Sequence, residues 1–182
     1  DNDSKKQAWY TMVEAISSFD LRETSSYDGN TIIDEVLAMG ETELDEKKVV
    51  HDTEKLALQA FLMDTLWAKI KDDRGLLLFF LVDPKRDKLS LLQKACMQGN
   101  EHNLEILIAG LMKYVTPTQR DIAFNCLIQK NDAHFNLIHQ ITKQGSTKNL
   151  MLVLNALEFF LEDYKEKVLA LMMEKNRAGF TV

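Results

Sequence analysis

A repeat of about 45 residues limits most strongly what this chain can fold into. When the sequence is shifted by 46 positions, Ser90–Gly99 overlies Asn136–Gly145, and the apolar residues stay in register beyond this segment. When it is shifted by 45 positions, Asp121–Lys130 overlies Glu166–Lys175. Self-similarity at a fixed period is typical of repeat proteins, in which each unit buries its apolar face against its neighbours.

The segment that opens each copy has the signals of a short capped helix. Thr31, Ser90 and Asn136 can each accept a hydrogen bond from the free amides at a helix start. A glycine follows each of them nine residues later and can end the helix in the left-handed conformation. Asn131–Asn136 also overlies Asn176–Thr181, so the same opening recurs near the end of the sequence.

Each copy has room for two further helices. Residues 103–114 and 149–161 have the apolar spacing of a second, longer helix. Thr116–Gln119 supplies a Thr cap, Pro at the first helical position and Gln at the third, which predicts the start of a third helix. Asp163–Glu166 gives the equivalent start in the next copy. Because the 182 residues contain only 2 prolines and 7 glycines, a turn-rich β-sandwich is disfavoured. We predict an all-α fold, a helical repeat solenoid with about three helices per 45-residue unit.

This pattern resembles the front half of an ankyrin repeat, whose signature is Thr-Pro-Leu-His-x-Ala with a glycine that closes the helix. His139 and Ala95 match the His and the Ala, whereas the Pro is replaced by apolar residues and the period exceeds the family's ~33 residues. Armadillo and HEAT units of ~40–47 residues match the length. The resemblance implies a solenoid that binds a protein or peptide partner, and such degenerate repeats are similar to those of effectors secreted by intracellular bacteria. The Thr position is taken by Thr31, Ser90, Asn136 and Thr181.

The copies of the repeat suggest how the chain is divided. An apolar period of 3.6 residues between Ala8 and Phe19 predicts an amphipathic helix that covers the open side of the first copy. Gly179–Val182 resembles the opening of another copy, so we expect the chain to be a fragment of a larger protein. The segments are an N-terminal capping helix (1–27), repeat 1 with an insertion (28–82), repeat 2 (83–130), repeat 3 (131–175) and the start of a further repeat (176–182).

No residue pattern predicts a catalytic residue, a cofactor or a metal, and we expect a protein that is not an enzyme. Cys96 and Cys126 lie on apolar helix stripes, where a free thiol packs as a small hydrophobe. His139 takes the structural His position of the ankyrin-like motif. His134 precedes it by five residues, whereas zinc-binding histidines on a helix are four apart. The sequence also lacks a phosphate-binding glycine motif.

Charge and hydropathy exclude further classes of partner. The net charge of -6, with both signs mixed along the chain, disfavours nucleic acid and anionic membranes. The longest apolar run, Leu76–Val82, is far shorter than the ~20 residues that cross a bilayer. Two cysteines fit a reduced compartment, so we expect a cytoplasmic protein, in the host cytoplasm if it is a secreted effector. The oligomeric state stays open.

The resemblance places the partner-binding surface on the turn tips and on the outward positions of each unit's first helix. These positions are polar and mildly basic, so an acidic protein or peptide segment is the expected partner. Two alternatives remain open. The stack positions a substrate for an enzyme whose catalytic domain lies outside this chain, or the chain is a compact helical bundle with an enzymatic or ligand-binding function and accidental repeats. The predicted surface residues are Arg86, Asp87, Lys88, Lys94, Met97, Gln98, Asp132, His134, Gln140, Lys143 and Gln144.

Overall fold

The computed structural model describes two compact units, one within residues 1–76 and one within residues 77–182. The described residues are 31–39, 53–81, 90–98, 101–131, 134–179 and 181, together with Gln7, Thr11, Glu14 and Ala15. They form helices and no strands, which confirms the all-α prediction for this part of the chain. Gln7, Thr11, Glu14 and Ala15 are helical, and the rest of the predicted capping helix lies outside the described residues.

A buried glutamine joins helices α2 and α3 of the first compact unit. Helix α2 (Ile32–Ala38) begins after Thr31, whose hydroxyl donates to Asp34 Oδ2 over 2.7 Å. Helix α3 (Thr53–Ile70) packs against α2. Gln59 of α3 donates through Nε2 to the carbonyls of Val36 and Leu37, at 3.0 and 3.1 Å. These carbonyls lie in the last turn of α2, where backbone carbonyls have no amide donor within the helix. The two bonds from Gln59 therefore cap the end of α2 and hold α3 against it.

Helix α4 (Arg74–Leu81) begins in the first compact unit and ends in the second. The predicted second helices, residues 103–114 and 149–161, are present, and each begins two residues earlier than predicted. The other elements of the second compact unit are α5 (Leu91–Met97), α6 (Glu101–Tyr114), the 3-10 turn η1 (Pro117–Gln119), α7 (Arg120–Ile128), α8 (Leu137–Gln144), α9 (Thr147–Phe159) and α10 (Leu161–Met173).

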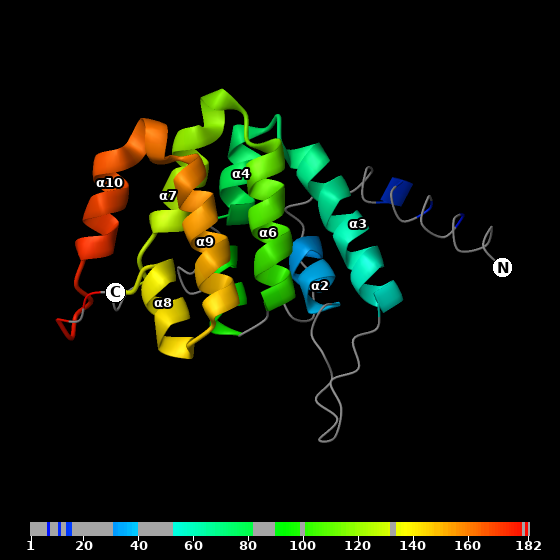
Figure 1. The fold of residues 1–182 in the computed structure, drawn as a ribbon. Helices are drawn as coiled ribbons and strands as arrows, with labels where there is room; N and C mark the ends of the chain where they lie inside the picture. The colour runs from blue at the N-terminus through cyan, green and yellow to red at the C-terminus, as the bar shows by residue number, and fades with distance from the viewer. Residues whose placement is uncertain are drawn as a thin grey trace, which may run out of the picture. The chain divides into compact units, whose positions relative to one another are not determined.

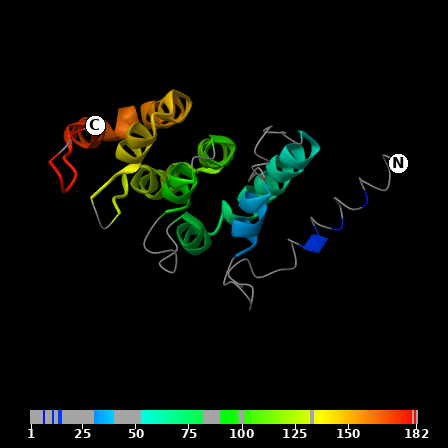
Figure 2. The ribbon, with the colours of Figure 1, turned by 90° about the horizontal axis from the view of Figure 1, so that it is seen from below.

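The helices of repeat 2 recur in repeat 3 at the shifts seen in the sequence. Helices α5 and α6 start 46 residues before α8 and α9, and α7 ends 45 residues before α10. Like helices also contact each other: α5 packs against α8, and α6 against α9. Figure 1 shows α6 and α9 side by side, and Figure 2 views them from their ends. The side chains between them form the core, with Leu104, Leu111 and Val153 fully buried.

The start of the third helix matches the prediction in repeat 2 and differs in repeat 3. The Thr116 amide donates to Gln119 Oε1 over 3.4 Å, and Pro117 is the first residue of η1, as the capping pattern predicts. In repeat 3, α10 begins at Leu161, two residues before the predicted cap Asp163, and its second segment begins after Tyr164. It bends at Tyr164, whose φ of -131° and ψ of 24° are non-helical. Gln119, 45 residues earlier, has a similar φ of -115° and ψ of 2°.

A buried glutamine joins repeat 2 to the start of repeat 3. Gln93 Oε1 accepts from the Ser90 amide at 3.2 Å, and the Ser90 hydroxyl accepts from the Gln93 amide at 3.1 Å, which caps α5 reciprocally. Gln93 Nε2 then donates to the carbonyls of Gln129 (2.8 Å) and Phe135 (3.5 Å), on the segment between α7 and α8. Asn136 caps α8 by accepting from the His139 amide at 2.9 Å. One side chain thus fixes both the start of α5 and the approach to α8.

The turn before α8 recurs after α10 with the same backbone geometry. The amide of His134 donates to the Asn131 carbonyl, and that of Gly179 to the Asn176 carbonyl, each over 2.9 Å. His134 and Gly179 both have positive φ, 60° and 82°. The sequence match between 131–136 and 176–181 therefore reflects one turn used twice. Gly145, with φ 74°, likewise ends α8 as predicted.

Replacing Gln93 with Ala should lower the free energy of unfolding by about 1–3 kcal/mol, because the Gln129 carbonyl would lose the donor, and the Ser90 amide the acceptor, that Gln93 supplies. Equilibrium denaturation in urea measures the change. Gln98→Ala, an exposed glutamine at the end of the same helix, is the matched control and should cost less than about 0.5 kcal/mol. Equal losses in the two variants would contradict the linking role of Gln93.

His134→Gly should stabilise the protein by about 0.5–1 kcal/mol. The left-handed backbone conformation is sterically unfavourable for a residue with a β-carbon and is not for glycine. Gly179→Ala should have the opposite sign and a similar size. A β-carbon there would meet no atom within 4 Å, so only the backbone conformation opposes it. Thermal or urea denaturation gives both values, and a loss of stability in His134→Gly would show that its side chain, not the turn, determines this position.

Candidate partner-binding surface

The described part of the predicted surface lies on α5, α8 and the turn between α7 and α8. Lys94, Met97 and Gln98 are on α5 or at its end, and Lys143 and Gln144 are in the last turn of α8. Since α5 packs against α8, the structure brings these two groups onto neighbouring helices. His134 is exposed in the turn. Four predicted residues lie outside the described residues: Arg86, Asp87, Lys88 and Asp132.

Exposure divides the predicted residues. Met97 is 51% exposed, Gln98, Lys143 and Gln144 are exposed, and Lys94 is half-buried. Gln140 does not present a binding surface, because it is only 8% exposed. Helix α8 packs against both α5 and α9, so more than one of its sides is covered. The described surface therefore consists of six residues: Lys94, Met97, Gln98, His134, Lys143 and Gln144.

The charge of this surface is of one sign. Helices α5 and α8 contain no aspartate or glutamate, and their formally charged residues are Lys94 and Lys143. The neighbouring helices carry the acidic residues: Glu101 and Glu105 on α6, and a cluster that includes Asp163 on α10. The two helices thus carry two lysines and no carboxylate in a protein of net charge -6.

Two of the surface side chains are positioned by neighbours. Lys143 Nζ lies 5.9 Å from the centre of the Phe135 ring, within range of a cation–π contact. Gln144 Nε2 donates to the Met97 carbonyl over 3.0 Å and so joins the end of α8 to the end of α5. Lys143 is therefore held by an aromatic ring while it stays exposed, and Gln144 links the two helices as well as lying at the surface.

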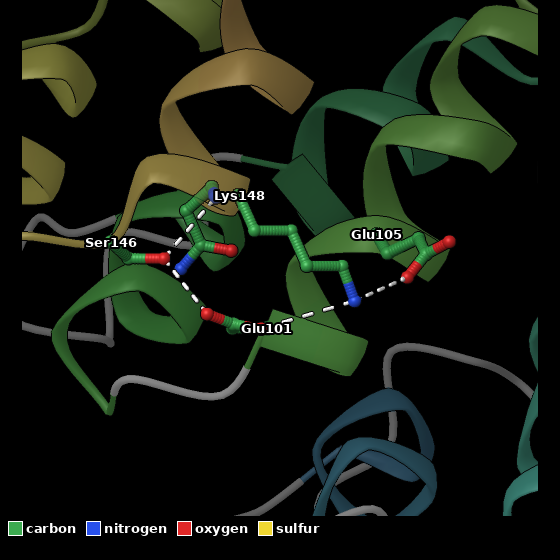
Figure 3. Close-up of polar contacts among 5 residues, drawn as sticks. Glu101, Glu105, Ser146 and Lys148 are labelled. Carbon is green, nitrogen blue, oxygen red and sulfur yellow. Dashed lines mark hydrogen bonds and ion pairs between the residues drawn. The ribbon is translucent and has the colours of Figure 1, made fainter.

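A polar cluster, which the sequence analysis missed, fixes α9 on α6. The Ser146 hydroxyl donates to Glu101 Oε1 over 2.9 Å (Figure 3), and Ser146 Oγ accepts from the Asn149 amide. Lys148 Nζ lies 3.3 Å from Glu105 and 3.9 Å from Glu101. No local sequence pattern marks these partners, because Glu101 and Lys148 are 47 residues apart in the chain. Two carboxylates share one ammonium, so the cluster keeps a formal charge of -1 while it links α6 to the start of α9.

Both cysteines and His139 are buried, whereas His134 is exposed. Cys96 and Cys126 are free thiols in the core, as predicted, and burial raises the pKa of each to about 12. Neither is a thiolate at neutral pH, which a nucleophile requires. His139 is 5% exposed, and its ring lies edge-on to Phe135 at 5.8 Å. Over the described residues, no three potential ligands gather to hold a metal, and no helix is both long and apolar enough to cross a membrane.

No protein-family model, curated protein or solved structure matches this chain. Its function therefore has to be inferred from its own residues and their arrangement.

Alkaline pH should destabilise the protein through its buried thiols. The folded pKa of about 12 lies above the unfolded value near 9, so the thiol contribution is complete below pH 9 and is lost as pH rises towards 12. Each thiol should lower the free energy of unfolding by up to about 1.4 kcal/mol per pH unit in that window. Urea denaturation of wild type and Cys96→Ala from pH 8 to about 11 measures the difference in slope. Parallel curves would contradict this assignment.

Proposed function

We propose that the protein is a protein-interaction module, a helical repeat solenoid with enlarged ankyrin-like units that binds an acidic segment of a partner protein. The observation that carries this proposal is the charge of the paired helices α5 and α8. They lie next to each other, expose basic and neutral polar side chains, and contain no acidic residue, although the whole chain is acidic. An acidic partner is attracted to this surface and repelled by most of the remaining protein.

The recurrence of helices supports the solenoid part of the proposal. Repeats 2 and 3 have first, second and third helices at shifts of 45–46 residues, and the first and second helices pack against their own equivalents. In such stacks, equivalent outward positions form a continuous row. Met97 and Gln98 of α5 are equivalent to Lys143 and Gln144 of α8 at the shift of 46, and all four are exposed, whereas Lys94 is half-buried one turn before Met97. Lys94 and Lys143 thus lie on adjacent helices, at positions that differ by about one helical turn.

Rigid positioning makes the surface suited to recognition. The starts of α5 and α8 are capped, and Gln93 and Gln144 join repeat 2 to repeat 3 at opposite ends of the first helices. A partner therefore meets a surface that does not have to be ordered on binding, which reduces the entropic cost of association. Met97, which is exposed between the polar residues, gives an adaptable apolar contact.

The size of the individual contacts predicts modest, salt-sensitive binding. An exposed ion pair contributes about 0.2–1 kcal/mol and is screened over roughly 10 Å at 0.1 M salt. Two such ion pairs and one buried methionine contribute less than about 5 kcal/mol together, which corresponds to a dissociation constant of the order of millimolar. Such a partner would exchange readily.

Charge reversal at Lys94 and Lys143 should weaken binding to an acidic peptide about tenfold. The probe is a fluorescein-labelled peptide of alternating glutamate and leucine, titrated with the protein at about 50 mM salt and followed by fluorescence anisotropy. The loss follows from two ion pairs of about 0.7 kcal/mol each. Raising the salt to about 300 mM should weaken wild type several-fold and leave the double variant nearly unchanged.

The matched control is Lys55→Glu with Lys113→Glu, which changes the net charge equally on exposed positions of α3 and α6. It should retain at least half of the wild-type affinity. If the control weakens binding as much as the test pair, the peptide senses only net charge and the surface on α5 and α8 is not the site.

A further inference from the structure

An internal interface shows how the third helix of one repeat is covered by the next repeat. Phe124 of α7 is fully buried and stacks on Tyr164 of α10, with ring centres 4.3 Å apart and planes 8° from parallel. The ring centre of Phe160, between α9 and α10, lies 5.8 Å from that of Phe124. Leu127, one turn along α7, is also fully buried. The covering element is therefore a helix pair that presents aromatic side chains near the bend of its last helix.

Ion pairs mark both ends of this interface. Arg120 at the start of α7 lies 2.8 Å from Asp163 of α10 and donates through Nη2 to the Phe159 carbonyl over 2.9 Å. Lys130, just past the end of α7, lies 2.6 Å from Glu174. The covered helix thus carries a cation at each end, and the covering helix carries the matching carboxylates.

Helix α10 repeats the covered face of α7, but its face is exposed. At the shift of 45 residues, Phe124, Leu127 and Ile128 correspond to Leu169, Met172 and Met173. These three are 55, 36 and 75% exposed, although their spacing makes one continuous apolar stripe. The flanking cations correspond as well, since Arg120 and Lys130 match Lys165 and Lys175, both exposed.

We propose that this stripe on α10 (Leu169, Met172 and Met173, with Lys165 and Lys175 at its ends) is the docking surface for a further helix pair of the α9–α10 type. Its occupant presents aromatic residues at the positions of Phe160 and Tyr164 and carboxylates at those of Asp163 and Glu174. The proposal depends on the repeats keeping the same register. It is separate from the proposed peptide binding on α5 and α8, so an experiment can disprove one of the two proposals and leave the other standing.

The turn after α10 supports this occupant over an unrelated partner. Asn176–Gly179 has the hydrogen bond and the positive φ of the turn that leads from α7 into α8. Thr181 then stands at the position of Asn136, which caps α8. The backbone beyond α10 is therefore arranged as it is where a helical unit follows and covers the preceding third helix.

The test appends the protein's own sequence as the probe. Residues 137–182 are joined after Thr181, in place of Val182, so that a second copy of α8–α10 follows the first. Hydrogen exchange should slow at least tenfold in α10, and binding of the dye ANS to exposed apolar surface should fall. The control carries the same extension with Phe160→Ala, Tyr164→Ala, Asp163→Lys and Glu174→Lys in the appended copy alone, and should leave α10 exchange near the wild-type rate.

The charges allow a sharper check. Lys165→Glu in the original α10 should lose at least half of the protection that the extension gives, and Asp163→Lys in the appended copy should restore it. A helical extension that leaves α10 exchange unchanged would overturn the proposal. So would an extension that stays unfolded, because the appended residues already fold within the protein. If wild type alone forms dimers that Leu169→Glu dissociates, a second copy of the chain is the occupant and the proposal is wrong.

Discussion

The arrangement of the second compact unit depends on one buried amide. Gln93 accepts a bond at the start of its own helix and donates to two carbonyls on the segment that leads into α8. An unmet buried carbonyl costs about 1–3 kcal/mol, so alternative placements of that segment are disfavoured. Because α8 begins immediately after it, the spacing of α5 and α8 follows from this contact. The bonds of Gln93 at one end of these helices, and the bond from Gln144 Nε2 to the Met97 carbonyl at the other, align the basic surface on α5 and α8.

Helices α7 and α10 show that a shared pattern does not by itself determine burial. Both carry apolar residues at the same three positions and cations at the same two flanking positions. On α7, Phe124 and Leu127 are fully buried and Phe124 stacks on Tyr164 of repeat 3, whereas on α10 Leu169 and Met173 remain more than half exposed. Amphipathic spacing indicates which face of a helix is apolar, and the neighbouring elements determine whether that face is buried.

Much of the fold could be predicted from local signals in the sequence. The Thr116 cap, the Pro117 helix start and the glycine at the end of α8 each depend on a few adjacent residues, and each occurs where predicted. The burial of Gln140, the reach of Gln93 and the pairing of Ser146 with Glu101 depend instead on which helices become neighbours. A stretch of ten adjacent residues in the sequence does not indicate which helices will be neighbours.

The two proposed surfaces differ in the physics of what they would bind. Covering Leu169, Met172 and Met173 removes apolar area from water and is worth about 1.5–3 kcal/mol for each fully buried side chain, with little dependence on salt. Each lysine on α5 or α8 contributes about 0.2–1 kcal/mol, and salt weakens it. A unit docked on α10 would therefore stay in place while an acidic segment exchanged on α5 and α8. The register that Gln93 maintains between repeats 2 and 3 would then serve both: it aligns the basic surface, and it repeats the geometry that a unit on α10 would continue.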